Sequence, residues 1–155
     1  MIRGAKIEDF DEIYRLHEML VKKLSTLEPD RFLLKDNEKV SFTERFNKYL
    51  KESNRKMIVY ELDGEIIGFG ACKILKSVNF SRFEEHGEIT EISVKEEMQN
   101  RGIGREIMKE LESFLKDNGI SEIVFLVESS NHQSLATWEK MNYKKETFVF
   151  KKMLK

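Results

Sequence analysis

Cysteine and proline are almost missing from this sequence. Cys72 is the only cysteine in 155 residues and Pro29 is the only proline, so no internal disulfide can form. The lack of disulfides favours a reducing compartment. Gly/Ser-rich linkers, internal repeats and low-complexity tracts are missing as well. A chain of this length and continuity is expected to form a single domain over residues 1–155.

Long apolar runs and an excess of positive charge are also missing. No run approaches the ~20 apolar residues of a membrane span. The first residues include Arg3 and Lys6 and lack the apolar stretch of a signal peptide. The formal net charge of -1 gives no electrostatic reason to expect nucleic-acid binding. We therefore expect a cytoplasmic protein that engages neither membranes nor nucleic acids.

Several motifs of known chemistry are absent. The three histidines, His17, His86 and His132, show no metal-ligand spacing with one another or with Cys72, so no metal site is expected. Cys72 lies in an apolar stretch, which predicts a packed core thiol rather than a nucleophile. The Gly-x-Ser-x-Gly signature of serine hydrolases does not occur.

Two familiar phosphate motifs can be tested directly. A P-loop, Gly-x-x-x-x-Gly-Lys-Ser/Thr, does not occur. A dinucleotide-binding turn needs Gly-x-Gly-x-x-Gly directly after a strand, and here Ile107 replaces the third glycine. Glu128 stands where a ribose-binding acid would follow, but the chain after it is too short for a doubly wound domain. The sequence therefore disfavours both.

The residues that are present suit a mixed fold. Hydrophobic residues make up 40%, and eleven Phe argue against disorder. Apolar spacing by three and four predicts helices, whereas alternation or a short apolar run predicts strands. The predicted helices cover about 10–24, 39–52, 103–117 and 132–141, and the predicted strands cover 1–6, 57–62, 66–75, 88–94, 123–127 and 144–152.

The order of these elements indicates the fold class. Asp63-Gly64, between two strands, predicts a tight antiparallel hairpin. The strand–helix–strand unit over 88–127 implies one parallel pair with a right-handed crossover. We therefore expect an α/β fold of the α+β kind, with a mixed, mostly antiparallel sheet flanked by helices.

Glycines mark a candidate anion site. Gly102 and Gly104 follow the strand at 88–94 after a turn and open a helix. A helix N-terminus has unpaired N–H groups and a partial positive charge, and glycine lets a phosphate approach the backbone. Arg101 and Arg105 add positive charge. This pattern predicts a pyrophosphate site; the alternative is an ordinary strand-to-helix turn with solvated arginines.

Two segments resemble the GNAT superfamily of N-acetyltransferases. Gln-Asn-Arg-Gly-Ile-Gly at 99–104 matches the family signature Gln/Arg-x-x-Gly-x-Gly/Ala. The segment 131–143 is similar to the second cofactor segment of the family, Asn-x-x-Ala-x-x-x-Tyr-Glu-Lys-x-Gly-Phe. The resemblance implies a GNAT-like sheet whose central parallel strands splay apart, and acetyl transfer from acetyl-CoA to a primary amine of a small molecule or protein. A homodimer is compatible with it.

The resemblance also implies a cofactor site. Main-chain amides at the start of the third long helix would hold the pyrophosphate, the strand before them would pair with the pantetheine arm, and two residues of the second segment would border the arm. The implied cofactor-binding residues are Ile92, Ser93, Val94, Gln99, Asn100, Arg101, Gly102, Ile103, Gly104, Arg105, Asn131 and Trp138.

Two glutamates are candidates for the catalytic proton acceptor. An attacking amine must lose a proton, and Glu88 stands on the strand where some family members carry a basic glutamate. Glu91 is a second candidate on the same strand. Alternation by two places them on opposite faces, so at most one faces the cleft unless a bulge intervenes. The alternative is that both are solvated or salt-bridged.

Trp138 departs from the family pattern. It stands where the family often has a tyrosine that protonates the leaving thiolate, and indole cannot supply that proton. The thiolate would leave unaided, or Tyr143 or Tyr60 would substitute, or the protein would be a non-catalytic acyl-CoA-binding or sensing module. Loops at 26–38 and 77–87 are the expected substrate walls.

Overall fold

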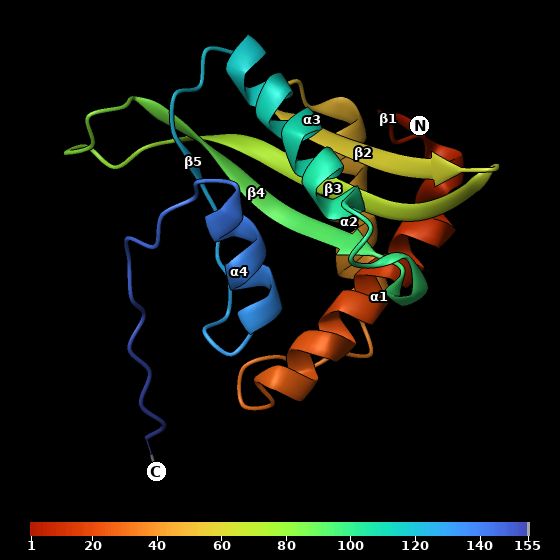
Figure 1. The fold of residues 1–155 in the computed structure, drawn as a ribbon, viewed down its shortest axis with the longest axis horizontal. Coiled ribbons are helices and arrows are strands. Elements are labelled where there is room, and N and C mark those ends of the chain that lie inside the picture. Colours follow the sequence, from red (N-terminus) through yellow and green to blue (C-terminus); the bar gives the residue numbers. More distant parts are fainter. Residues whose placement is uncertain (155) are drawn as a thin grey trace.

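The computed structural model describes residues 1–154, in which the helices and strands follow the predicted order up to residue 140 (Figure 1). The elements are β1 (Ile2–Gly4), a 3-10 turn (Ile7–Asp9), α1 (Phe10–Leu27), α2 (Glu38–Lys51), β2 (Arg55–Leu62), β3 (Glu65–Lys76), β4 (Glu85–Val94), a second 3-10 turn (Glu96–Met98), α3 (Ile103–Asp117), β5 (Ile123–Val124) and α4 (His132–Lys140). None of the helices in this part of the chain is long and apolar enough to cross a membrane.

The sheet is mixed and mostly antiparallel, as predicted. Its strands lie in the order β1-β2-β3-β4-β5, and only the β4–β5 pair is parallel. The predicted hairpin is confirmed, because Asp63 and Gly64 both have positive φ, 50° and 81°, between β2 and β3. Such φ values at both central residues are typical of a tight hairpin turn.

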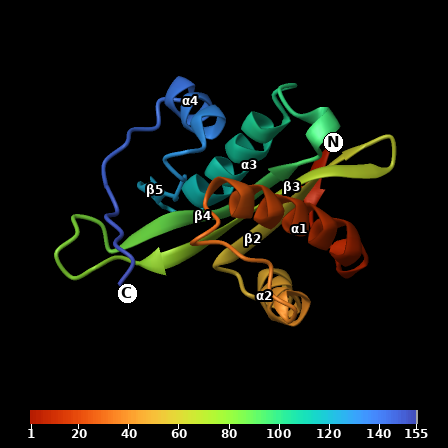
Figure 2. The same ribbon diagram turned by 90° about the horizontal axis from the view of Figure 1, so that it is seen from below.

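Helices cover both faces of the sheet. Figure 2 shows α3 on one face and α1 and α2 on the other. The first face buries Ile107, Met108 and Leu111 of α3 against the strands, and the second buries Phe42 and Phe46 of α2. Each face therefore has its own hydrophobic core.

Glycine in β3 lets α3 lie close to the sheet. A Cβ on Gly70 would be only 2.3 Å from Cγ2 of Ile107. No larger side chain fits there without moving the helix, because that contact is well inside van der Waals distance. The position of α3, and of the turn before it, depends on this close approach.

The parallel strands separate early. β5 pairs with β4 only at Gly87 and Glu88, so the rest of β4 has no partner on that side among residues 1–154. This confirms the splayed central strands. The predicted strand at 123–127 was too long, because β5 ends at Val124 and its chain then leaves β4.

The prediction of a strand at 144–152 was wrong. Those residues form no helix or strand, and Figure 1 shows the segment running away from the sheet after α4. Phe148 and Phe150 are exposed. The alternation of apolar residues was real, but a strand also needs an edge to pair with, and two-residue β5 provides almost none.

Candidate acetyl-CoA site

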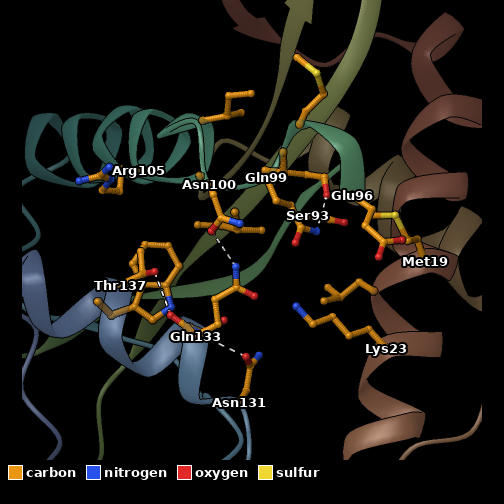
Figure 3. Close-up of a pocket in the computed structure, with 18 of the residues that line it drawn as sticks. Met19, Lys23, Ser93, Glu96, Gln99, Asn100, Arg105, Asn131, Gln133 and Thr137 are labelled. Atoms are coloured by element: carbon orange, nitrogen blue, oxygen red, sulfur yellow. Dashed lines mark hydrogen bonds between the residues drawn. The ribbon is translucent and has the colours of Figure 1, made fainter.

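A cavity of about 960 Å³ opens between α1, the start of α3, and α4. Its lining includes every predicted cofactor-binding residue except Arg101, which is exposed outside it. Figure 3 shows Met19 and Lys23 of α1 on one side of the cavity, with Asn131 and Gln133 on the other. Sequence motifs 30 to 40 residues apart therefore meet at one site.

Unpaired main-chain amides occur at the turn before α3. Within residues 1–154, no protein group accepts a hydrogen bond from the N–H groups of residues 100–104. Gly102 is the N-cap of α3, and no side chain caps this helix. Asn100 and Gly102 have φ of 62° and 86°, in the left-handed region. Successive N–H groups in a turn of this kind form an anion-binding concavity.

Gly104 leaves room beside these amides. A Cβ at this position would find no atom nearer than Cγ2 of Ile92, at 4.0 Å. The packing of the protein therefore does not require glycine here, and this side of the turn is open for a phosphate to approach the backbone. The turn fits the pyrophosphate of coenzyme A in shape and in chemistry.

Two glutamine side chains hold this turn in place. Nε2 of Gln99 donates to the main-chain oxygen of Val94 at 3.0 Å, which ties the turn to the end of β4. Nε2 of Gln133 donates to Oδ1 of Asn100 at 2.9 Å, which ties it to α4 (Figure 3). The turn is thus fixed from both sides of the cavity.

The register of β4 shows which backbone groups face the open edge. The N–H of Lys95 donates to the oxygen of Ile67, and Ser93 pairs with Phe69, so these residues face β3. Because backbone groups alternate along a strand, those of Ile92 and Val94 face the side that β5 has left. An extended ligand would pair with these two residues rather than with the N–H of Ser93.

The residues of the second segment lie across the cavity. Asn131 is the N-cap of α4, and its Oδ1 accepts from the N–H of Ser134 at 3.3 Å. The NH2 group of the same side chain can then donate a hydrogen bond to a ligand in the cavity. Trp138 packs edge-on against Phe125, with ring centroids 5.7 Å apart. Its ring is part of the cavity wall.

One face of α1 forms a wall of the cavity that the sequence did not identify. Most of its residues are polar, and they are Arg15, Glu18, Met19, Leu20, Lys22, Lys23 and Thr26. The residues recur at three- and four-residue steps, but nothing local indicates that such a face lines a cavity. Together with Arg105 and Lys140 they make the lining predominantly cationic, which favours a phosphate-rich ligand. Of the two predicted substrate walls, only Thr26 of the first reaches the cavity.

Glu88 and Glu91 lie on the same face of β4. Ala71 pairs with Glu91 and Cys72 with Ile89, so Thr90 is an extra, bulged residue. The bulge cancels the alternation, and both glutamates face α1 and α2. Glu88 pairs with Lys73 at 3.1 Å, and Glu91 contacts His17. Neither glutamate lines the cavity, so both lie beside the β4 edge rather than in the cofactor pocket.

The two tyrosines considered as substitutes for the general acid point elsewhere. The hydroxyl of Tyr143 donates to Glu112 on α3, and burial together with this carboxylate raises its pKa. The neighbouring carboxylate of Glu106, also on α3, raises the pKa of Tyr60. Neither residue lines the cavity. Burial raises the pKa of the Cys72 thiol to about 12, as expected for a core thiol.

Known proteins share both the sequence pattern and the fold. The model of the acetyltransferase (GNAT) family matches residues 14–143. An N-alpha-acetyltransferase of Saccharolobus solfataricus is 26% identical over 93% of this chain and 80% of its own length. An uncharacterized N-acetyltransferase of Archaeoglobus fulgidus is 35% identical over 76% of this chain and 75% of its own length.

Solved structures agree on the fold. A protein of Bacillus halodurans is similar with a TM-score of 0.86, at 20% identity and over 99% of both chains. An aminoglycoside N-acetyltransferase solved in complex with CoA is similar with a TM-score of 0.76, at 15% identity and over 99% of both chains. The family match covers most of the chain and both cofactor segments. This protein therefore belongs to the GNAT family of acetyltransferases.

Proposed function

We propose that this protein transfers the acetyl group of acetyl-CoA to the α-amino group at a polypeptide N-terminus. One observation carries the acetyl-CoA part of this proposal. The free amides of residues 100–104 border a cavity that continues to the open edge of β4 at Ile92 and Val94. A diphosphate joined to a long amide-bearing arm matches both ends of this cavity.

The residues around the cavity would act in sequence. The amides of 100–104 and the cationic lining bind and orient the donor. Main-chain groups of Ile92 and Val94 pair with its arm as a neighbouring strand would. An N–H on this edge polarises the thioester carbonyl. The pKa of a thiol is ~8.5, so the thiolate can leave without a general acid. This agrees with Trp138, which cannot supply a proton, at the border of the site.

Glu88 or Glu91 would accept the proton of the amine. Both face α1 and α2, the side of the sheet opposite α3, so the acceptor would approach from there. Glu91 directly precedes Ile92 on the open edge, whereas Glu88 still pairs with Val124 of β5. We therefore assign the proton to Glu91 and keep Glu88 as the alternative.

The acceptor class is supported by the relatives. Three archaeal proteins at 26% identity over more than nine-tenths of this chain are named N-alpha-acetyltransferase. The aminoglycoside-modifying neighbours are at most 18% identical, which supports the shared fold only. A polypeptide α-amine is thus the better supported acceptor.

A thiol-release assay over an amine panel tests the proposal. The panel contains peptides with a free N-terminus, the same peptides with a blocked N-terminus and an internal lysine, a polyamine and an aminoglycoside. We expect turnover only on free N-termini. Turnover on the polyamine or aminoglycoside alone would keep acetyl transfer and reject the acceptor. Coenzyme A binding with no turnover on any amine would instead identify a non-catalytic acyl-CoA-binding module.

A further inference from the structure

The ring of His17 lies between two carboxylates from different elements. Its Nδ1 is 2.5 Å from Oε1 of Glu91 on β4, and its Nε2 is 3.0 Å from Oε1 of Glu38 on α2. His17 is only 5% exposed, and its ring stacks on Phe42 with centroids 4.5 Å apart. One imidazole on α1 therefore connects the candidate proton acceptor with the helix beyond it.

This geometry specifies the charge of the ring. An ionised carboxylate only accepts hydrogen bonds, so a histidine that bonds one through each nitrogen must donate from both. That is the imidazolium form. Burial alone would lower the pKa of His17, but the hydrogen bonds and charge of Glu91 and Glu38 outweigh it and raise the pKa.

Further polar and charged side chains surround the ring of His17. Nη2 of Arg45 lies 2.8 Å from Oε1 of Glu38 and holds that carboxylate on α2. Burial would raise the pKa of Glu38, yet Arg45 and His17 together lower it. On α1, the ring of Tyr14 is 6.1 Å from that of His17. The cluster bonded around the ring thus contains two carboxylates and the guanidinium of Arg45, and the ammonium of Lys39 lies 5.4 Å from the ring centroid of Tyr14.

Glu91 keeps one oxygen free. Oε1 is occupied by His17, whereas Oε2 accepts no hydrogen bond from residues 1–154. No buried side-chain oxygen in this part of the chain lacks a partner, so Oε2 reaches solvent. The carboxylate is therefore fixed by one oxygen, and its other oxygen is solvent-accessible on the side of the sheet that carries α1 and α2.

We propose that His17 is the positioning residue that aims Glu91 at the attacking amine, and that its own protonation controls transfer. This rests on the proposed acetyl transfer. The lone pair of the neutral amine forms the bond to the acetyl carbon, and the carbon–sulfur bond breaks so that coenzyme A leaves as its thiolate. The nitrogen then loses a proton to Oε2 of Glu91 and from there to water, and the electrons of that N–H bond stay on nitrogen. When His17 loses a proton at alkaline pH, it can donate to only one carboxylate, and the orientation of Glu91 is lost.

Nitrogen-15 NMR of the histidine rings tests the cluster without any turnover. The chain has three histidines, His17, His86 and His132, whose ring signals have to be assigned separately. At pH 7.5 an imidazole of ordinary pKa is about nine-tenths neutral, whereas we expect His17 to remain doubly protonated. Glu91→Gln should move its titration to lower pH. A singly protonated His17 at pH 7.5 in the unmodified protein would overturn the proposal.

Kinetics test the positioning role. His17→Gln should lower kcat by about tenfold or more, leave KM for acetyl-CoA unchanged because His17 does not line the cavity, and abolish the alkaline fall in kcat that His17 causes. Glu38→Gln should also lower kcat. Glu44→Gln, on the exposed side of α2, is the matched control. Retained coenzyme A binding shows that each variant is folded.

Two kinetic results would contradict the proposal. One is an alkaline limb that is the same in His17→Gln as in the parent. The other is full turnover in Glu91→Gln together with loss in Glu88→Gln. If the parent protein acetylates no amine, the proposed function itself fails, and the NMR titration still reports separately whether the imidazolium cluster exists.

Discussion

Gly104 and Ile92 face each other across the start of α3, with 4.0 Å between the position of a Cβ on Gly104 and Cγ2 of Ile92. A methyl group fits the folded chain there, in agreement with the Gly/Ala that the family signature allows at this position. A longer side chain would occupy the space through which a phosphate would reach the amides of residues 100–104.

Gly104→Leu should therefore weaken coenzyme A binding without loss of stability. Leucine favours a helix over glycine by up to about 1 kcal/mol, so the free energy of unfolding should stay equal or rise. We expect the Kd for coenzyme A to rise by about tenfold, or ~1.4 kcal/mol, by calorimetric titration.

The other end of α3 supplies the control. Gly119 has φ of 77° and no atom within 4 Å of an added Cβ, and it does not line the cavity. Gly119→Ala should cost about 1–2 kcal/mol of stability through left-handed strain and leave the Kd unchanged. Equal coenzyme A affinity in Gly104→Leu and the parent would count against the pyrophosphate site.

The hydrogen bond between Gln133 and Asn100 should make coenzyme A binding at the turn before α3 depend on α4. Gln133→Ala and Asn100→Gly each remove it, and glycine tolerates the φ of 62° at position 100. Each variant should raise the Kd for coenzyme A a few-fold. In the double variant the effects should not add, with a coupling energy of about 0.5–1.5 kcal/mol. Additive effects would mean that the bond does not support binding.

The sequence predicted the turn before α3 and the helix that follows it because their signals are local. Glycine spacing, a preceding strand and a following amphipathic helix all lie within residues 88–117, so no distant contact is needed to interpret them. The order of elements through α4 was predictable for the same reason. The strand at 144–152 was not, because pairing depends on how far β5 extends.

The acceptor side of the site depends on contacts that sequence spacing does not encode. The bulge at Thr90 has no glycine or proline to mark it, yet it decides that Glu88 and Glu91 share a face. His17 and Glu91 are 74 residues apart and meet only after α1 packs on β4. Ser93 fixes that packing, since its Oγ donates to the main-chain oxygen of Leu16 at 2.9 Å.

Tyr143 and Tyr60 should prove dispensable for the chemical step. Both hydroxyl groups are directed to carboxylates of α3, outside the cavity. Tyr143→Phe and Tyr60→Phe should each keep kcat within about twofold, while Tyr143→Phe loses about 1 kcal/mol of stability with its hydrogen bond. A fall of kcat by about a hundredfold in either variant would identify a general acid.

Asp9 should make stability depend on acid pH. Its carboxylate is 9% exposed and accepts from both terminal guanidinium nitrogens of Arg3, at 2.7 and 3.0 Å. It also accepts from the N–H of Lys6 at 2.7 Å. The hydrogen bond from Arg3, partly opposed by burial, lowers the pKa of Asp9 below its ordinary value of 3.8.

A lowered pKa in the folded state fixes the sign of the effect. The stabilisation is fully present above the unfolded value of 3.8 and is lost as the pH falls through the folded pKa. Asp9→Asn should therefore lower the free energy of unfolding by about 1.5–3 kcal/mol at pH 7, and urea titrations should show this difference shrinking below pH ~4. Asp11→Asn is the matched control, because Asp11 is 73% exposed and lies 3.7 Å from Lys39. It should change stability by less than about 0.5 kcal/mol. A difference for Asp9→Asn that persists undiminished at pH 2 would show that the charge of Asp9 does not stabilise the fold.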